Sequence, residues 1–160
     1  MISELTGTSD DYVNLINPGD SATTATVTCR DAAGQTVGTP AEFDLPPNAR
    51  AFFSLTERFG EAAAPCYLAV TASQPIGGFQ FALSDGTMAA TNAIPLKDLP
   101  AWETALYGAH FAEGRLYRTV LDLINHSGSA AQVTITALRD DGSTLAASAP
   151  FTMPAGGLLH

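Results

Sequence analysis

Apolar and polar residues alternate one by one along several short stretches of the chain, and this period of two is typical of half-buried β-strands. In residues 24–30, Ala25, Val27 and Cys29 alternate with threonines and an arginine, and residues 132–138 follow the same pattern. Three further stretches have the length of strands: 49–55, 66–73 and 77–83. Only residues 55–64 are typical of a short helical turn. The pattern predicts an all-β protein, an antiparallel sandwich.

The strand pattern occurs twice. Residues 15–46 align with residues 123–154 without a gap at an offset of 108, and twelve of the 32 aligned pairs are identical. A period this long is typical of a duplicated small domain rather than of a solenoid repeat. We therefore expect a complete first unit at 1–94 and the front half of a second unit at 105–160. Residues 95–104, which follow no alternating pattern, are expected to be the linker.

The second unit is expected to begin with two strands, at 105–111 and 116–125, joined by a turn at Glu113 and Gly114. Residues 1–11 do not match the first of these strands, so the first unit lacks it or replaces it. The second unit stops before the strands that complete the first. A half sandwich would expose apolar residues such as Val133, Ile135 and Phe151, and such faces recruit partners. We expect a homodimer through the incomplete second unit; the alternative is that residues 105–125 complete the first unit within one chain.

The formal net charge of −9 narrows the range of partners. An acidic surface repels phosphate groups, so neither nucleic acid nor an anionic membrane is expected as a partner. No stretch approaches the length of an apolar transmembrane helix. The N-terminal residues lack the pattern of a signal peptide. The expectation is either a cytoplasmic protein or part of an exported chain, and no cofactor is expected.

Two cysteines lie on apolar strand faces. Cys29 shares its face with Ala25 and Val27, and Cys66 shares a face with Leu68 and Val70, so both side chains are expected in the same core. Two buried free thiols are one possibility, since cysteine is often buried. A Cys29–Cys66 disulfide is the other, which an exported origin would permit.

The stretch "HFAEGRLYRTVLDLINHSGSAAQVTITALRDDGS" at 110–143 resembles tandem immunoglobulin-like β-sandwich repeats of bacterial secreted and surface proteins. The matching segments are His110-Phe111, Gly114, Leu123 to Asn125, Val133 to Thr136 and Asp140 to Gly142; the first unit matches from Tyr12 onward and includes Asn17-Pro18. The resemblance implies an immunoglobulin-like fold, an extracellular or cell-surface location and no catalytic residues. The function it implies is a structural or adhesive module of a larger bacterial extracellular protein. A carbohydrate-binding accessory module is the alternative.

One tetrapeptide is similar to the surroundings of a catalytic serine. "GDSA" at 19–22 contains Ser21, but the second unit has "SGSA" at the equivalent place, where the acid is missing. A nucleophilic serine needs a strained strand-to-helix turn or an oxyanion hole. Asp, Gly and Ser are standard turn residues, so a turn is expected and the chain is not expected to be an enzyme.

Metal ligands are sparse in the sequence. His110, His126 and His160 have no pairwise spacing typical of a zinc site, so no metal site is expected from them. Asp140 and Asp141 are weak candidates for calcium, as is the Asp10-Asp11 pair, because no loop supplies the further acids that calcium requires. The first unit has alanines in place of Asp140 and Asp141.

Three aromatic residues are candidates for a platform that stacks against sugar rings: Trp102, Tyr107 and Tyr117. The alternative is structural, with Trp102 holding the linker against one end of a sandwich and the tyrosines packing along strands. An exposed row of aromatic side chains would separate a glycan-binding module from a spacer.

Overall fold

The computed structural model describes residues 10–60, 66–84, 87–94, 106, 113–114, 117–118 and 121–159. Within these ranges every strand pair is antiparallel. The predicted all-β class is confirmed. The predicted linker at 95–104 lies outside the described residues.

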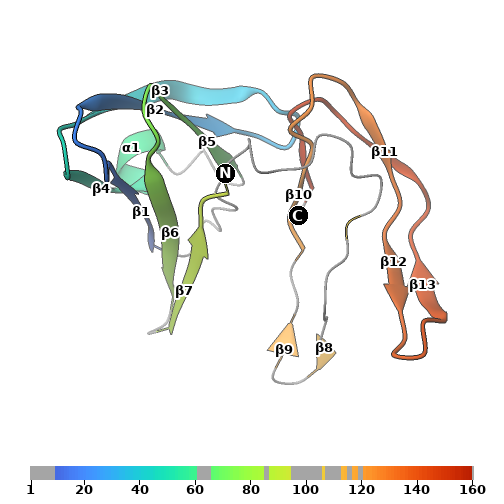
Figure 1. The fold of residues 1–160 in the computed structure, drawn as a ribbon. Helices are drawn as coiled ribbons and strands as arrows, with labels where there is room; N and C mark the ends of the chain where they lie inside the picture. The colour runs from blue at the N-terminus through green and yellow to red at the C-terminus, as the bar shows by residue number, and fades with distance from the viewer. Residues whose placement is uncertain are drawn as a thin grey trace.

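The first unit, residues 10–94, contains two sheets that face each other (Figure 1). One sheet has the order β4-β1-β6-β7 and comprises β4 (Arg50–Ser54), β1 (Asp10–Ile16), β6 (Gly77–Ser84) and β7 (Thr87–Asn92). The other has the order β3-β2-β5 and comprises β3 (Thr36–Leu45), β2 (Thr23–Arg30) and β5 (Tyr67–Ala72). The stretches predicted to be strands in this unit all form strands. The sequence analysis missed β7, although "SDGT" before it contains Asp-Gly, a dipeptide favoured in hairpins.

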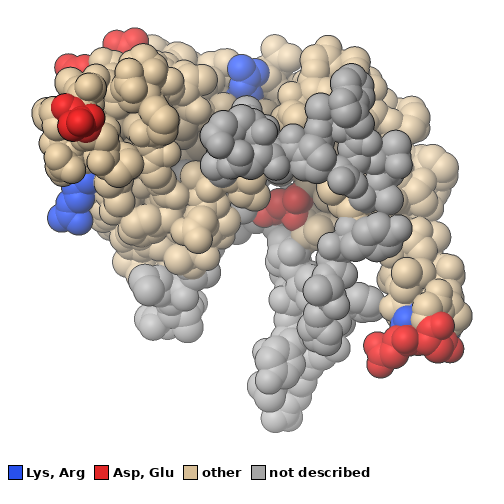
Figure 2. Space-filling model, in the orientation of Figure 1, with Lys and Arg blue, Asp and Glu red and all other residues tan. Residues whose placement is uncertain are grey.

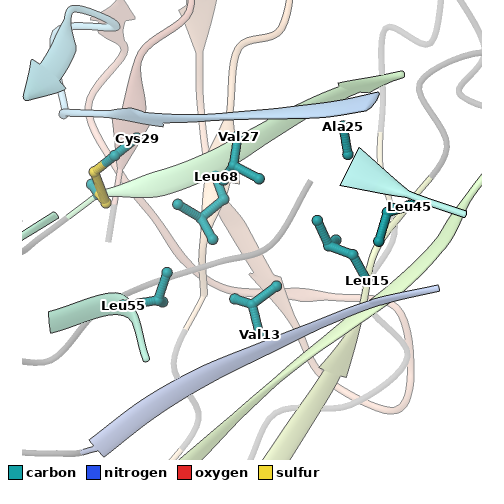
Figure 3. Packing of buried hydrophobic residues seen from close by; sticks show 9 residues of the cluster. Val13, Leu15, Ala25, Val27, Cys29, Leu45, Leu55 and Leu68 are labelled. Carbon is teal, nitrogen blue, oxygen red and sulfur yellow. A yellow bond between two sulfur atoms is a disulfide. The ribbon is translucent and has the colours of Figure 1, made fainter. Parts of the chain in front are cut away.

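The core of the first unit lies between these sheets (Figure 3). Val13 and Leu15 project from β1 towards Ala25 and Val27 of β2, because alternate residues of a strand face the same side. The remaining fully buried members are Cys29, Leu45, Leu55, Cys66 and Leu68. Residues that alternate with these ones face outward, so the same alternation also determines which side chains form the outer surfaces.

The short helix α1 (Leu55–Phe59) follows β4 and contributes Leu55 to the core. Ser54 caps its N-terminus by accepting a hydrogen bond from the Glu57 backbone N–H at 3.3 Å. Gly60 ends it with a φ of 80°. The helical turn predicted in this stretch is confirmed for residues 55–59.

The second unit comprises the strands after residue 112: β8 (Glu113–Gly114), β9 (Tyr117–Arg118), β10 (Leu123–Ile124), β11 (Ala131–Val133), β12 (Thr136–Leu138), β13 (Thr144–Ala147), β14 (Phe151–Met153) and β15 (Leu158–Leu159). The pairs are β8–β9, β10–β15, β11–β14 and β12–β13. Glu113 pairs with Arg118 and Gly114 pairs with Tyr117. The two residues that were predicted to form the turn are therefore part of the strand pair, and the chain reverses after them.

Strand register in the second unit matches that of the first at an offset of 108 in two of the strand pairs. Leu15 pairs with Ala51 in the first unit, and Leu123 pairs with Leu159 in the second. Likewise, Thr23 pairs with Leu45, and Ala131 pairs with Met153. Equivalent sequence therefore forms equivalent strand pairs at these positions, whereas the pairing of Ala137 with Ala146 lies one residue away from that of its counterpart Cys29 with Val37.

Burial differs between the two units at equivalent positions. Ala25 and Val27 are completely buried, whereas their counterparts Val133 and Ile135 are only half-buried. Val13 is completely buried, whereas its counterpart Leu121 is 49% exposed. In the first unit β5 and β6 pair with β2 and β1 and cover these positions. The described part of the second unit has no counterpart of β5 or β6, so its apolar positions remain partly open.

Candidate functional site

The turn that contains Ser21 is organised around the buried side chain of Asn17. Asn17 Nδ2 donates to the carbonyl oxygens of Ser21 at 2.8 Å, Leu45 at 3.0 Å and Pro46 at 3.1 Å. Its Oδ1 accepts from the Gly19 backbone N–H at 3.0 Å. This network joins the turn after β1 to the end of β3. Ser21 therefore contributes a backbone carbonyl to a structural turn.

Asn125 makes the equivalent contacts in the second unit. Its Nδ2 donates to the carbonyls of Ser129 at 2.8 Å, Met153 at 3.3 Å and Pro154 at 2.9 Å. Its Oδ1 accepts from the Ser127 backbone N–H at 3.1 Å. The sequence analysis identified the matching asparagines but not their role, which depends on the distant carbonyls that folding brings near.

The predicted calcium candidates do not meet at one site. Asp140 and Asp141 lie in an exposed turn, where Asp141 Oδ1 accepts from the backbone N–H of Ser143 at 2.8 Å and from its hydroxyl at 2.6 Å. These hydrogen bonds lower the pKa of the Asp141 carboxyl below its usual range. Asp11 instead faces the interior of the first unit and accepts from Gln80.

Other predicted candidates are dispersed or lie outside the described residues. His126 is exposed, whereas His110, Trp102 and Tyr107 lie outside the described residues. The structure also does not describe the side chains of three further candidates: Asp10, Tyr117 and His160. Within the described ranges, no three His, Cys, Asp or Glu residues come close enough together to hold a metal ion.

Cys29 and Cys66 are joined by a disulfide in the core of the first unit. Cys29 lies on β2 and Cys66 directly precedes β5, and their Cα atoms are 5.9 Å apart. The bond encloses β3, β4 and α1 in its loop. It therefore fixes the end of the β2–β5 pair that lies next to the second unit.

The junction between the units is a packed, hydrogen-bonded contact. Tyr67, which is 4% exposed, donates its hydroxyl to the Gly156 carbonyl at 2.8 Å, and the Leu158 backbone N–H donates to the Ala32 carbonyl at 3.2 Å. Burial raises the pKa of the Tyr67 phenol, and the nearby Arg30 guanidinium opposes that rise only in part. The two hydrogen bonds join the turn after β2 and the start of β5 to the turn before β15.

Glycine at position 34 permits this contact. Gly34 has a φ of +80°, and a Cβ atom there would collide with the Ala155 carbonyl oxygen and lie 2.7 Å from the Gly156 carbonyl carbon. Its counterpart Gly142 has a φ of +81°, but a Cβ atom there would meet nothing within 4 Å. The positive φ favours glycine in both turns. Only at Gly34 does the missing side chain also allow residues 155 and 156 to approach closely.

A group of aromatic side chains covers the outward face of the β4-β1-β6-β7 sheet. The Tyr12 ring is parallel to its neighbours, with centroids 5.3 Å from those of both Phe52 and Phe81. Phe52 and Phe81 are 5.8 Å apart, and Phe81 and Phe79 are 6.1 Å apart. We call Tyr12, Phe52, Phe79 and Phe81 the aromatic face. The sequence analysis missed it, although the alternation within each strand already placed these residues opposite the core.

No protein family, no curated protein and no solved structure matches the chain. No helix in the described ranges is long and apolar enough to cross a membrane.

Proposed function

We propose that the chain is a non-enzymatic structural or adhesive β-sandwich module of a larger bacterial extracellular protein. The junction between the units carries this proposal. A rigid spacer holds its parts in a fixed relative orientation. The contact of Tyr67 with Gly156, together with the close approach of Gly34 to residues 155–156, restricts that orientation.

The disulfide supports the same proposal. It restrains β5, the strand that begins with Tyr67, close to where the second unit docks. This covalent restraint holds together the two segments that contact the second unit, the one with Ala32 and the one with Tyr67. Disulfides persist in oxidising compartments, which agrees with the proposed extracellular location.

Small-angle X-ray scattering with two matched glycine variants tests the proposal. Gly34→Ala puts a methyl group into the junction and is expected to increase the radius of gyration and produce the scattering profile of two loosely joined bodies. Gly142→Ala adds the same methyl group at nearly the same φ with open space around it, so the profile should match that of the parent protein. Equal profiles for all three proteins would show that the junction does not fix the orientation.

An enzymatic activity would contradict the proposal directly. If the protein had a reproducible hydrolytic activity that Ser21→Ala or His110→Ala abolished, the structural assignment would be wrong. Ser21 supplies its backbone carbonyl to Asn17, so Ser21→Ala retains the turn and removes only the hydroxyl.

A carbohydrate-binding accessory module is a second candidate, and one observation favours it. The aromatic face places four stacked rings on one outer surface, with Phe52 exposed and the others partly buried, at residues other than those expected from the sequence. The two candidates are compatible, because an adhesive module needs both a fixed scaffold and a binding surface.

A further inference from the structure

We propose that the outward face of the β4-β1-β6-β7 sheet binds a neutral glycan across its strands, on the aromatic face and the amide of Asn14. The inference adds a ligand class to the adhesive part of the proposed function and rests on that part. The proposed scaffold does not depend on it.

The strand register arranges aromatic rings and amides alternately across the sheet. Asn14 of β1 pairs with Phe52 of β4 on one side and with Phe79 of β6 on the other. Phe79 pairs in turn with Asn92 of β7, whose side chain is exposed. The row is therefore ring, amide, ring, amide, with neighbouring strands about 4.8 Å apart.

A second row of side chains lies beside the first. Tyr12 pairs with Ser54 and with Phe81, and Phe81 pairs with Ala90. This row places two further rings next to Asn14 and Phe79 and a hydroxyl side chain next to Phe52. The resulting surface offers broad apolar contact with polar groups at regular intervals, which suits a sugar because sugars have apolar C–H faces bordered by hydroxyls.

Asn14 has an unmet hydrogen-bonding capacity on this face. It is only 6% exposed, and among the described residues its Oδ1 has no hydrogen-bond partner and is shielded from solvent. A buried acceptor without a donor costs stability, so a residue of this type signals a role outside the free protein. The acceptor needs an O–H or N–H donor, and a sugar hydroxyl is such a donor.

The Phe52 ring is the most exposed part of this site. Its side chain is 53% exposed, whereas the other three rings of the aromatic face are partly buried. Exposed side chains change rotamer readily, and the site requires a rotation of this ring that gives a hydroxyl access to its strand neighbour Asn14. Binding then exchanges water on an exposed phenyl ring for a sugar face, while the buried oxygen gains its missing donor.

The charge distribution favours a neutral ligand. The chain carries a net charge of −9, yet the outward positions between Asp10 at the start of β1 and Arg50 at the start of β4 carry no charged residue. Among the described residues, the charged ones on the molecular face shown in Figure 2 lie in small separate groups. An uncharged site on an acidic protein repels polyanions and accepts an uncharged polymer.

Affinity gel electrophoresis with polymers of matched backbone tests the inference. The intact protein is run through gels that contain hydroxyethylcellulose, barley β-glucan or glucomannan as neutral probes, and through carboxymethylcellulose as the anionic counterpart of the first. At least one neutral polymer should retard the protein, and carboxymethylcellulose should retard it less. If no neutral polymer retards it, or if carboxymethylcellulose retards it most, the inference is overturned.

Three variants locate the binding surface. Phe52→Ala removes an exposed ring and should raise the dissociation constant about tenfold, the effect of losing one good aromatic contact. Asn14→Leu removes the unpaired acceptor and should weaken binding while leaving the melting temperature unchanged or higher. Leu106→Ala is the control, because this leucine is also exposed but lies outside the β4-β1-β6-β7 sheet.

The variants also separate this inference from its alternatives. Binding that Phe52→Ala and Asn14→Leu leave unchanged would place the glycan elsewhere. A wild-type dimer that Phe52→Ala converts to a monomer, with no retardation by any polymer, would assign the face to self-association. Both results would overturn the glycan site and leave the scattering test of the scaffold unaffected.

Discussion

Asn17 and Asn125 occupy equivalent positions 108 residues apart and hold equivalent turns with the same set of hydrogen bonds. Each side chain donates to a carbonyl four residues later and to two carbonyls at the end of a distant strand. The two differ in burial, because Asn17 is completely buried and Asn125 is only half-buried. Comparing the two positions therefore shows how much burial adds to the stability that the same hydrogen bonds provide.

Alanine substitution at these two positions should have unequal effects. Asn17→Ala removes the donor to the buried Leu45 carbonyl and to two part-buried carbonyls, so it should lower the free energy of unfolding by about 2–3 kcal/mol. Asn125→Ala should cost about 1 kcal/mol because water reaches its partners. Urea denaturation monitored by circular dichroism gives both values. Equal losses would mean that burial does not govern the strength of this network.

Loss of the disulfide should destabilise the first unit. Cys29 and Cys66 are 37 residues apart, and cross-linking a loop of this length stabilises a protein by about 3–4 kcal/mol in the chain-entropy treatment. The Cys29→Ala/Cys66→Ala double variant should unfold at correspondingly lower urea concentration.

Mass spectrometry checks the bond itself. Iodoacetamide added to the denatured protein should label neither cysteine before reduction and both cysteines after it. Labelling without a reductant would show two free thiols and would contradict the disulfide.

Tyr67→Phe should weaken the junction and change its response to alkali. The substitution removes the hydrogen bond to the Gly156 carbonyl, at a cost of about 1 kcal/mol. Because the pKa of Tyr67 in the folded protein is raised above 10.0, the unfolded chain loses the phenol proton first as the pH increases. The stability that Tyr67 contributes is therefore complete below pH 10 and declines as the pH rises through the higher pKa of the folded state.

Melting temperatures of the parent protein and Tyr67→Phe at several pH values between 8 and 11 provide the measurement. The difference between the two proteins should be constant up to pH 10 and decrease above it. A constant difference up to pH 11 would show that the phenol keeps its ordinary pKa.

Self-association through the second unit remains a prediction. Leu121, Leu138 and Leu145 are about half exposed there, and exposed apolar surface favours a partner. Light scattering across a dilution series should give the mass of a dimer that dissociates on dilution. Leu138→Ser combined with Leu145→Ser should give a monomer, whereas Ile94→Ser, at an equally exposed residue of the first unit, should not. A monomeric mass with a concentration-independent melt would exclude the dimer.

The sequence determined which segments become strands and which side of each strand is apolar. Alternation in residues 24–30 placed Ala25, Val27 and Cys29 on one face, and these residues are fully buried in the structure. The sequence can show this because successive side chains of any β-strand point to opposite faces, wherever the strand lies in the fold. The offset of 108 likewise located equivalent turns before any contact was known, and Gly34 and Gly142 adopt nearly equal φ values.

The tertiary structure decided everything that depends on which strands become neighbours. From the sequence alone, Asn17 is a residue in a turn. Its amide reaches the Leu45 and Pro46 carbonyls only because folding places the end of β3 beside that turn. Gly34 and Gly142 are indistinguishable until the second unit packs against one of them. The aromatic face combines β1, β4 and β6, whose order in the sheet differs from their order in the chain. Pairing between distant strands is set by burial of the whole core, so no local pattern of residues specifies it.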